Sequence, residues 1–96
     1  MKEEIKTALI QLFEEWADDR VIETEILPQS GSYREYIRLI GEKRTVLGAF
    51  NADKKENAAF LSFSRFFAEK GLSVPEIYCE NNEQDIYLLQ DLGNTT

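Results

Sequence analysis

The 96-residue chain is the length of one domain, because compact domains typically contain about 100 to 150 residues, and we treat residues 1–96 as that domain. Its composition, 43% hydrophobic and 30% charged, is typical of a globular protein rather than a disordered or fibrous one. The chain has no His and one Cys, which excludes imidazole bases, His-containing catalytic triads, Cys-rich metal sites and an internal disulfide.

The net charge of −7 argues against binding to a nucleic-acid backbone, which needs clustered Lys and Arg. The charge is uneven: residues 30–55 contain six bases and three acids, between two acidic flanks. This local basic region suits a small anionic ligand, although scattered solvated charge explains it equally well. The sequence contains neither a signal-peptide pattern nor an apolar run of membrane-spanning length, so we expect a cytoplasmic protein with no nucleic-acid or membrane partner.

The first half of the chain predicts one helix and three strands. From Glu3 to Ala17, apolar residues recur every three or four positions, which indicates an amphipathic helix. Strands are predicted at 21–27, 33–40 and 45–50, with turns at 28–32 and 41–43. Arg34, Tyr36 and Arg38 share one face of the second strand. Three sequential strands with short connections indicate an antiparallel meander.

A second helix is predicted after Asn51, because Asp53 and Glu56 have capping-box spacing and Gly71 stands where a C′ glycine ends a helix. We expect its buried face to be a stripe that packs against a sheet: Ala59, Phe60, Phe63, Phe66 and Phe67. Strands at 76–80 and 85–90 form a second hairpin. The predicted fold class is α+β: five mostly antiparallel strands, a long helix between the third and fourth strands, and an extra N-terminal helix.

Several polar residues could bind a ligand. Ser30, Gly31 and Ser32 at the tip of the first hairpin could surround a phosphate with backbone N–H groups and hydroxyls, although small residues are also common in ordinary turns. Glu56 could cap its helix or pair with a Lys from the third strand.

The remaining polar candidates have structural alternatives. Arg34 and Arg38 could hold phosphate or pair with Glu25 or Glu35. Cys79 is expected to be a small buried hydrophobe without chemistry of its own.

Three stretches, in this order, resemble the aminoglycoside phosphotransferase and choline kinase family, most closely its bacterial amino-sugar kinase branch, which includes N-acetylmuramate kinases. They are GSYREYIRL at 31–39, GLSVPEI at 71–77 and LLQDLG at 88–93, and together they span most of residues 21–96. The resemblance implies the fold of a protein-kinase-like N-terminal lobe. It also implies seven ATP-binding residues: Ser30, Gly31, Ser32, Glu56, Gln90, Asp91 and Leu92.

In that family, Ser30, Gly31 and Ser32 would cover the ATP phosphates. Gln90, Asp91 and Leu92 would form the hinge beside the adenine edge. Glu56 would match the helix glutamate that orients a strand Lys. Two departures follow. The third strand contains no Lys, and the nearest bases lie outside it, at Lys43, Arg44, Lys54 and Lys55. The H-G-D-x-x-x-x-N catalytic loop and the subsequent metal-binding Asp are also missing, so no catalytic or metal-binding residue is assigned to this chain.

We therefore expect the ATP-binding N-terminal lobe of a cytoplasmic phosphotransferase that is inactive as this fragment. In the complete enzyme, ATP, Mg²⁺ and a C-terminal catalytic lobe would act on a small hydroxylated substrate: a sugar, an amino sugar or an aminoglycoside. The alternative is a stand-alone α+β protein-interaction module that uses an acidic helix or an exposed strand edge.

Overall fold

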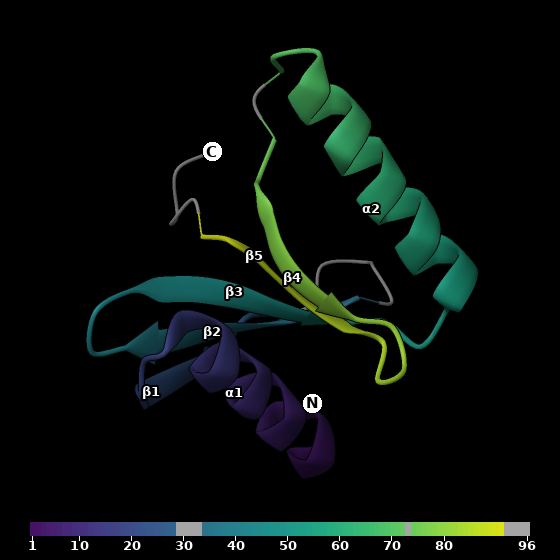
Figure 1. The fold of residues 1–96 in the computed structure, drawn as a ribbon. Helices are drawn as coiled ribbons and strands as arrows, with labels where there is room; N and C mark the ends of the chain where they lie inside the picture. The colour runs from purple at the N-terminus through teal and green to yellow at the C-terminus, as the bar shows by residue number, and fades with distance from the viewer. Residues whose placement is uncertain (29–33, 73, 92–96) are drawn as a thin grey trace.

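The computed structural model describes residues 1–28, 34–72 and 74–91, which form an antiparallel sheet with one helix on each face (Figure 1). The elements are α1 (Glu3–Ala17), β1 (Val21–Ile26), β2 (Glu35–Gly41), β3 (Thr45–Phe50), α2 (Lys54–Glu69), β4 (Ile77–Asn81) and β5 (Ile86–Gln90). The predicted α+β class, with a five-stranded antiparallel sheet and two helices, is confirmed. None of the described helices is long and apolar enough to cross a membrane.

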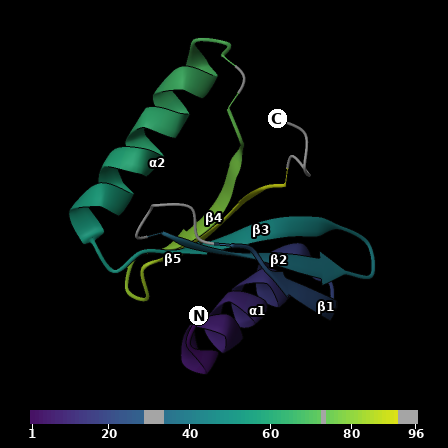
Figure 2. The same ribbon diagram turned by 180° about the vertical axis from the view of Figure 1, so that it is seen from behind.

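The sheet has the strand order β1-β2-β3-β5-β4, and every neighbouring pair is antiparallel (Figure 2). The predicted meander of β1, β2 and β3 is confirmed, as is the hairpin of β4 and β5. Because β5 pairs with β3, one row of directly opposed residues crosses four strands: Glu25, Arg38, Leu47 and Leu89. This row and the row that contains Tyr36 and Ala49 face α2.

The opposite face of the sheet packs against α1. Leu9 and Phe13 of α1 are fully buried among the apolar side chains of that face: Ile37, Leu39, Val46, Ile86 and Leu88. Two glycines let the helix approach closely. A Cβ on Gly48 would lie 3.0 Å from Cδ2 of Leu9, and one on Gly41 would lie 2.8 Å from Cζ of Phe13. The main core of the domain is therefore the layer between α1 and the sheet.

The two predicted ends of α2 are confirmed. The Asp53 carboxylate accepts hydrogen bonds from the N–H groups of Lys55 and Glu56, both at 3.1 Å. At the other end, Gly71 has a φ of +78°, and the N–H of Leu72 donates to the carbonyl of Phe67. A left-handed residue followed by such a bond is the usual way to end a helix at glycine.

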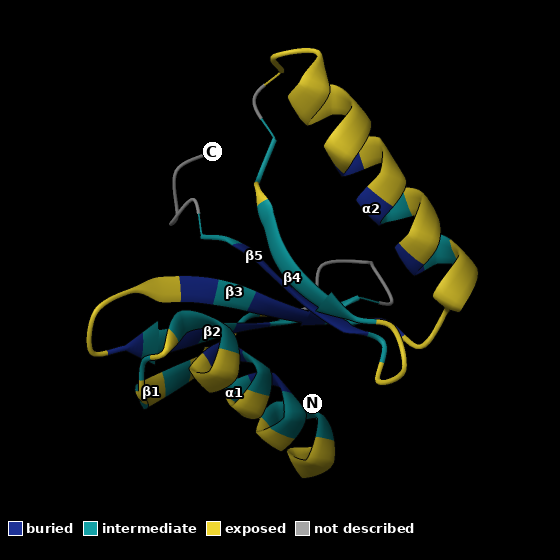
Figure 3. Ribbon diagram, in the orientation of Figure 1, coloured by how far each residue is buried: buried dark blue, intermediate teal, exposed yellow. Residues whose placement is uncertain are grey.

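The prediction that the aromatic stripe forms the buried face of α2 is wrong. Phe63 and Phe66 are 60% and 51% exposed, and Phe67 is also exposed. The helix instead packs through Asn57, Leu61 and Ser64, whose spacing of four and three places them on one narrow strip (Figure 3). Leu61 fills the space over the sheet residues Ala49, Tyr87 and Leu89. The aromatic rings lie farther round the helix, so only Phe60 packs at the edge of this cluster.

Candidate functional site

A cleft of about 710 Å³ lies between α2 and the sheet, on the face opposite α1. Its floor is formed by Tyr36, Leu47 and Leu89, which come from three neighbouring strands. Apart from Ser64, the wall and one end are aromatic or apolar: Phe60, Phe63, Phe67, Val74 and Pro75. We call this space the α2 cleft. A largely apolar floor with an aromatic wall suits an apolar ring better than a flexible polar chain.

An ion pair lies beside the aromatic wall of the α2 cleft. Nη2 of Arg34 donates to Oε1 of Glu56 at 3.3 Å, and the Arg34 guanidinium lies 4.2 Å from the centroid of the Phe60 ring. The Arg34 side chain is largely buried, whereas that of Glu56 is partly exposed. Burial and ring stacking together restrict the guanidinium to a narrow range of orientations.

The pairing decides between the two roles left open for Glu56. In a complete capping box, the Glu56 carboxylate would bind the N–H of Asp53. That N–H donates instead to Oδ1 of Asn51 at 3.0 Å, and Glu56 binds Arg34. The partner is therefore an arginine immediately before β2, and not a lysine of the third strand.

Tyr87 lies beneath this ion pair and is 1% exposed. Burial raises the pKa of its phenol well above the ordinary value, and the neighbouring Tyr36 adds to the effect, whereas Arg34 opposes it. The phenol therefore stays neutral throughout the physiological pH range. Charges next to such a poorly hydrated group interact more strongly than charges in water.

A second, tighter ion pair lies at the far side of the floor. Arg38 is directly opposite Leu47, and its Nε donates to Oδ2 of Asp91 at 2.7 Å. Nη2 donates to Oδ1 of the same carboxylate at 3.4 Å, and Nη1 donates to Glu25 at 3.1 Å. The side chains of Arg38 and Asp91 are only 13% and 10% exposed. The hydrogen bond to Asp91 raises the pKa of Arg38, so the guanidinium is permanently charged.

The structure brings two of the predicted ATP-binding residues, Glu56 and Asp91, to the side of the sheet that faces α2, where they pair with Arg34 and Arg38, although neither lines the α2 cleft. Gln90 is turned toward β4 instead: its N–H donates to the carbonyl of Glu76, and its side-chain oxygen accepts from the Glu76 N–H. The other four predicted residues lie outside the described residues: Ser30, Gly31, Ser32 and Leu92.

Sequence reasoning identified the shared face of Arg34, Tyr36 and Arg38, but of the partners found in the structure it named only Glu25. Among the alternatives it weighed, the pairing of Arg38 with Glu25 is confirmed. The residues it missed are the floor positions Leu47 and Leu89. Their alternation along short strands was visible, but nothing in the sequence indicated which face α2 would leave uncovered.

Two other features of the described residues are less suited to ligand chemistry. No group of three or more His, Cys, Asp or Glu within 1–28, 34–72 and 74–91 could hold a metal ion. Cys79 packs at the edge of the α1 core, and desolvation, followed by the nearby Glu80 charge, raises the pKa of its thiol. A raised thiol pKa disfavours the nucleophilic thiolate.

Comparisons with known proteins gave no match, whether to protein-family models, to curated proteins or to solved structures. A fold of this kind can also carry unrelated functions. Function is therefore inferred from the residues of the site.

Proposed function

We propose that the chain is the ATP-binding N-terminal lobe of a phosphotransferase that acts on a small hydroxylated substrate. It would belong with the aminoglycoside phosphotransferase and choline kinase family, nearest the amino-sugar kinase branch. The observation that carries the proposal is the α2 cleft, whose lining residues Phe60 and Leu47 lie next to the arginines that pair with Glu56 and Asp91. Glu56 and Asp91 are two of the residues that the resemblance assigns to nucleotide binding.

The side chains around the cleft fit the parts of ATP. A purine ring can lie on Leu47 and Leu89, where it would lose its contact with water and gain apolar contacts. The Arg34 guanidinium beside Phe60 supplies the positive charge that phosphate oxygens need. Arg38 binds Asp91 and so fixes the residue that follows β5, within the predicted hinge.

When bound, ATP would supply the phosphoryl group that the complete enzyme transfers. The described residues of this chain would bind and orient the nucleotide and keep water from its base. They offer no cluster suited to Mg²⁺, and no step through the metal is assigned to them. A C-terminal catalytic lobe would provide the metal ligands and the aspartate that positions the substrate hydroxyl.

The proposal is tested by titrating ATP into the ¹⁵N-labelled chain and following its amide resonances. We expect saturable, millimolar binding, because one wall of the binding cleft belongs to the other lobe. The shifts should concentrate at Leu47, Leu89 and Asp91. L47E should abolish them by placing a carboxylate on the floor, where it repels the phosphates, whereas L72E should not, since Leu72 is exposed and outside the cleft lining. Shifts on the α1 face, or equal responses from both variants, would contradict the proposal.

One observation favours the alternative of a stand-alone interaction module. Phe63, Phe66 and Phe67 form an exposed aromatic group on α2, with ring centroids 5.7 and 6.2 Å apart, and exposed apolar groups often mark protein contacts. The two functions predict different masses for the native protein. The mass is measured after the protein is captured from its source cell with an antibody to this region. A species several times heavier than 11.1 kDa supports the lobe, and a species of 11.1 kDa supports the module.

A further inference from the structure

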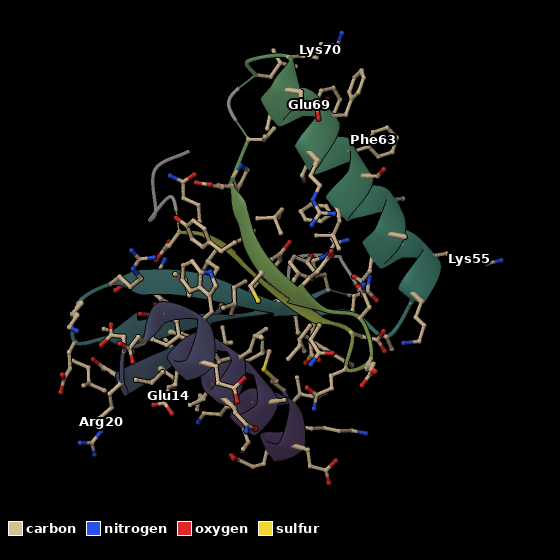
Figure 4. All side chains as sticks on the ribbon, in the orientation of Figure 1. Glu14, Arg20, Lys55, Phe63, Glu69 and Lys70 are labelled. Atoms are coloured by element: carbon tan, nitrogen blue, oxygen red, sulfur yellow. The ribbon has the colours of Figure 1, made fainter. Side chains whose placement is uncertain are left out.

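The outer face of α2, which points away from the sheet, has exposed aromatic rings at its centre. Phe63 and Phe66 are 60% and 51% exposed, and Figure 4 shows Phe63 directed away from the sheet. At about 100° of rotation per residue, Phe66 lies on the side of the helix opposite the buried strip of Asn57, Leu61 and Ser64. The sheet therefore cannot cover these rings, and an exposed apolar face of this kind is typical of a contact with another molecule.

The same face has a hollow of about 430 Å³ beside the rings. It is lined by Ala59, Ser62, Phe63 and Phe66. These four residues have the spacing i, i+3, i+4 and i+7, which is the arrangement that receives one side chain of a facing helix when two helices interlock. Because Ala59 and Ser62 are small, the hollow is open, and a cavity of roughly 150 Å³ is already enough for a benzene ring. The face thus presents an aromatic projection next to a hollow that fits one.

Two exposed charges of opposite sign lie at equal spacing on either side of the hollow. Lys55 lies seven residues before Ser62 and Glu69 lies seven residues after it, so the three residues follow one flank of α2. Lys55 extends away from the sheet (Figure 4). Neither Lys55 nor Glu69 forms an ion pair with any other residue that the structure describes. A two-fold axis through the hollow would bring Lys55 of each copy to Glu69 of the other.

We infer that the outer face of α2 is a docking surface for a second copy of this chain, with the two α2 helices antiparallel. The inference goes beyond the proposed function and does not depend on it. When a two-fold axis relates two antiparallel helices, each flank of one helix faces the same flank of the other, with the direction reversed. Lys55 then meets Glu69, the two Ser62 residues meet, and Phe63 of each copy enters the hollow of the other.

The sizes of the central side chains favour the antiparallel direction. An antiparallel pair places Ala59 of one copy opposite Phe66 of the other, so a small side chain faces a large one at both ends of the contact. A parallel pair would place Phe66 opposite Phe66 and leave a gap between the two Ala59 side chains. Neighbouring helix dipoles also attract when the helices are antiparallel and repel when they are parallel.

The inference is tested by sedimentation equilibrium of the chain up to about 1 mM. Because α2 has 16 residues, fewer than the about 20 to 30 per side of a standard interface, we expect a dissociation constant on the order of 100 µM. Unfolding measured at a few micromolar would then report on the monomer. F63S and F66S should each raise the dissociation constant about tenfold or more, since each removes a central ring. I22S is the matched control, because Ile22 is 61% exposed but lies on β1.

The charge pair gives a test of the arrangement that loss of apolar surface cannot imitate. K55E and E69K should each raise the dissociation constant about threefold, because like charges then face each other across the contact. The double variant K55E/E69K should return to the wild-type constant, since it exchanges the two signs within the same pairs. In a parallel pair these residues would lie at opposite ends of the contact, and the double variant would recover nothing.

Each outcome decides the inference. A chain that remains monomeric at about 1 mM overturns it, and so does a dimer that I22S disrupts and F63S leaves intact, because that contact would lie at β1. A dimer that F63S weakens, but that K55E/E69K fails to restore, overturns the antiparallel arrangement. Weakening by F63S together with recovery in the double variant supports both the surface and the direction of the helices.

Discussion

Nε of Arg38 donates a hydrogen bond to Oδ2 of Asp91 at 2.7 Å, which ties the middle of β2 to the residue after β5 across 53 positions of sequence. The same guanidinium also binds Glu25. One arginine therefore has two carboxylate partners in different surroundings, because Asp91 is 10% exposed and Glu25 is 56% exposed.

This difference predicts unequal costs for removing each carboxylate charge. D91N should lower the free energy of unfolding by about 2 kcal/mol, since hydrogen bonds to charged groups contribute about 1.5 to 3 kcal/mol when they are shielded from water. E25Q should cost less than about 1 kcal/mol, as exposed ion pairs do. Urea unfolding of both variants measures the difference, and an equal loss from the two would contradict it.

The position of α2 predicts which of its apolar residues stabilise the domain. L61A should cost about 3 kcal/mol, within the range of buried Leu to Ala changes, because Leu61 fills the space over the sheet. F66S should change stability by about 0.5 kcal/mol or less, since Phe66 is half-exposed and the two residues have similar helix propensities. Chemical denaturation tests this order. A larger cost for F66S would show that the aromatic face is buried in solution.

Asp19 predicts a pH-dependent contribution to stability. Desolvation alone would raise the pKa of its carboxyl, but backbone N–H groups of Lys43, Arg20, Arg44 and Glu42 outweigh it and hold the pKa below 3.8. A depressed pKa in the folded state stabilises the protein above the unfolded-state pKa, and this stability is lost as the pH falls through the folded value.

The variant D19N should therefore unfold at a lower urea concentration than the wild type at pH 6. The difference should shrink below pH 3.8 and vanish once the wild-type carboxyl is protonated. E23Q, which alters an exposed acid in β1, serves as the comparison. If the difference in urea midpoint between D19N and the wild type stays constant from pH 6 to pH 2, the depressed pKa of Asp19 is not its cause.

Alanine substitutions at two glycines should lower the stability of the domain for different reasons. Gly71 has open space around it, so G71A should cost about 1 kcal/mol through its left-handed backbone alone. A methyl group on Gly41 would meet the Asp19 carboxylate and lie 2.8 Å from Cζ of Phe13, and overpacking of this kind costs about 1 to 3 kcal/mol. F13L should therefore recover part of the stability lost in G41A but none of that lost in G71A, as measured by thermal unfolding of both double variants.

The parts of the fold that local chemistry controls could be predicted from the sequence. Helix α1 and strand β3 have the predicted bounds, and α2 is capped by Asp53 and ends at Gly71, because periodicity and capping depend on residues within a few positions of one another. The rotation of α2 depends instead on which side chains fit a twisted sheet. The buried strip of α2 is Asn57, Leu61 and Ser64, of which Leu61 packs with Ala49, Tyr87 and Leu89, and its mixed polarity concealed it beside the more hydrophobic phenylalanines.

The candidate site was predictable only in part, for a related reason. Asp91 was selected through the resemblance, and Glu56 through its place in the second helix as well, whereas their partners Arg34 and Arg38 come from the other end of a long connection. Both arginines were visible on one face of the strand predicted at 33–40. Which carboxylate each would meet is decided by the strand order, with β5 inserted beside β3, and no local pattern encodes that insertion.

The narrow strip through which α2 touches the sheet also affects the dynamics of the domain. Helix α1 places two buried apolar side chains, Leu9 and Phe13, against the sheet. Helix α2 contributes one large buried apolar side chain, Leu61. Regions with few buried apolar contacts open at a lower free energy than the global transition. The amide hydrogens of α2 should accordingly exchange with solvent before those of α1 and the central strands, and a ligand bound in the α2 cleft should slow that exchange. The helix beside the cleft is thus the element most able to respond to what the cleft binds.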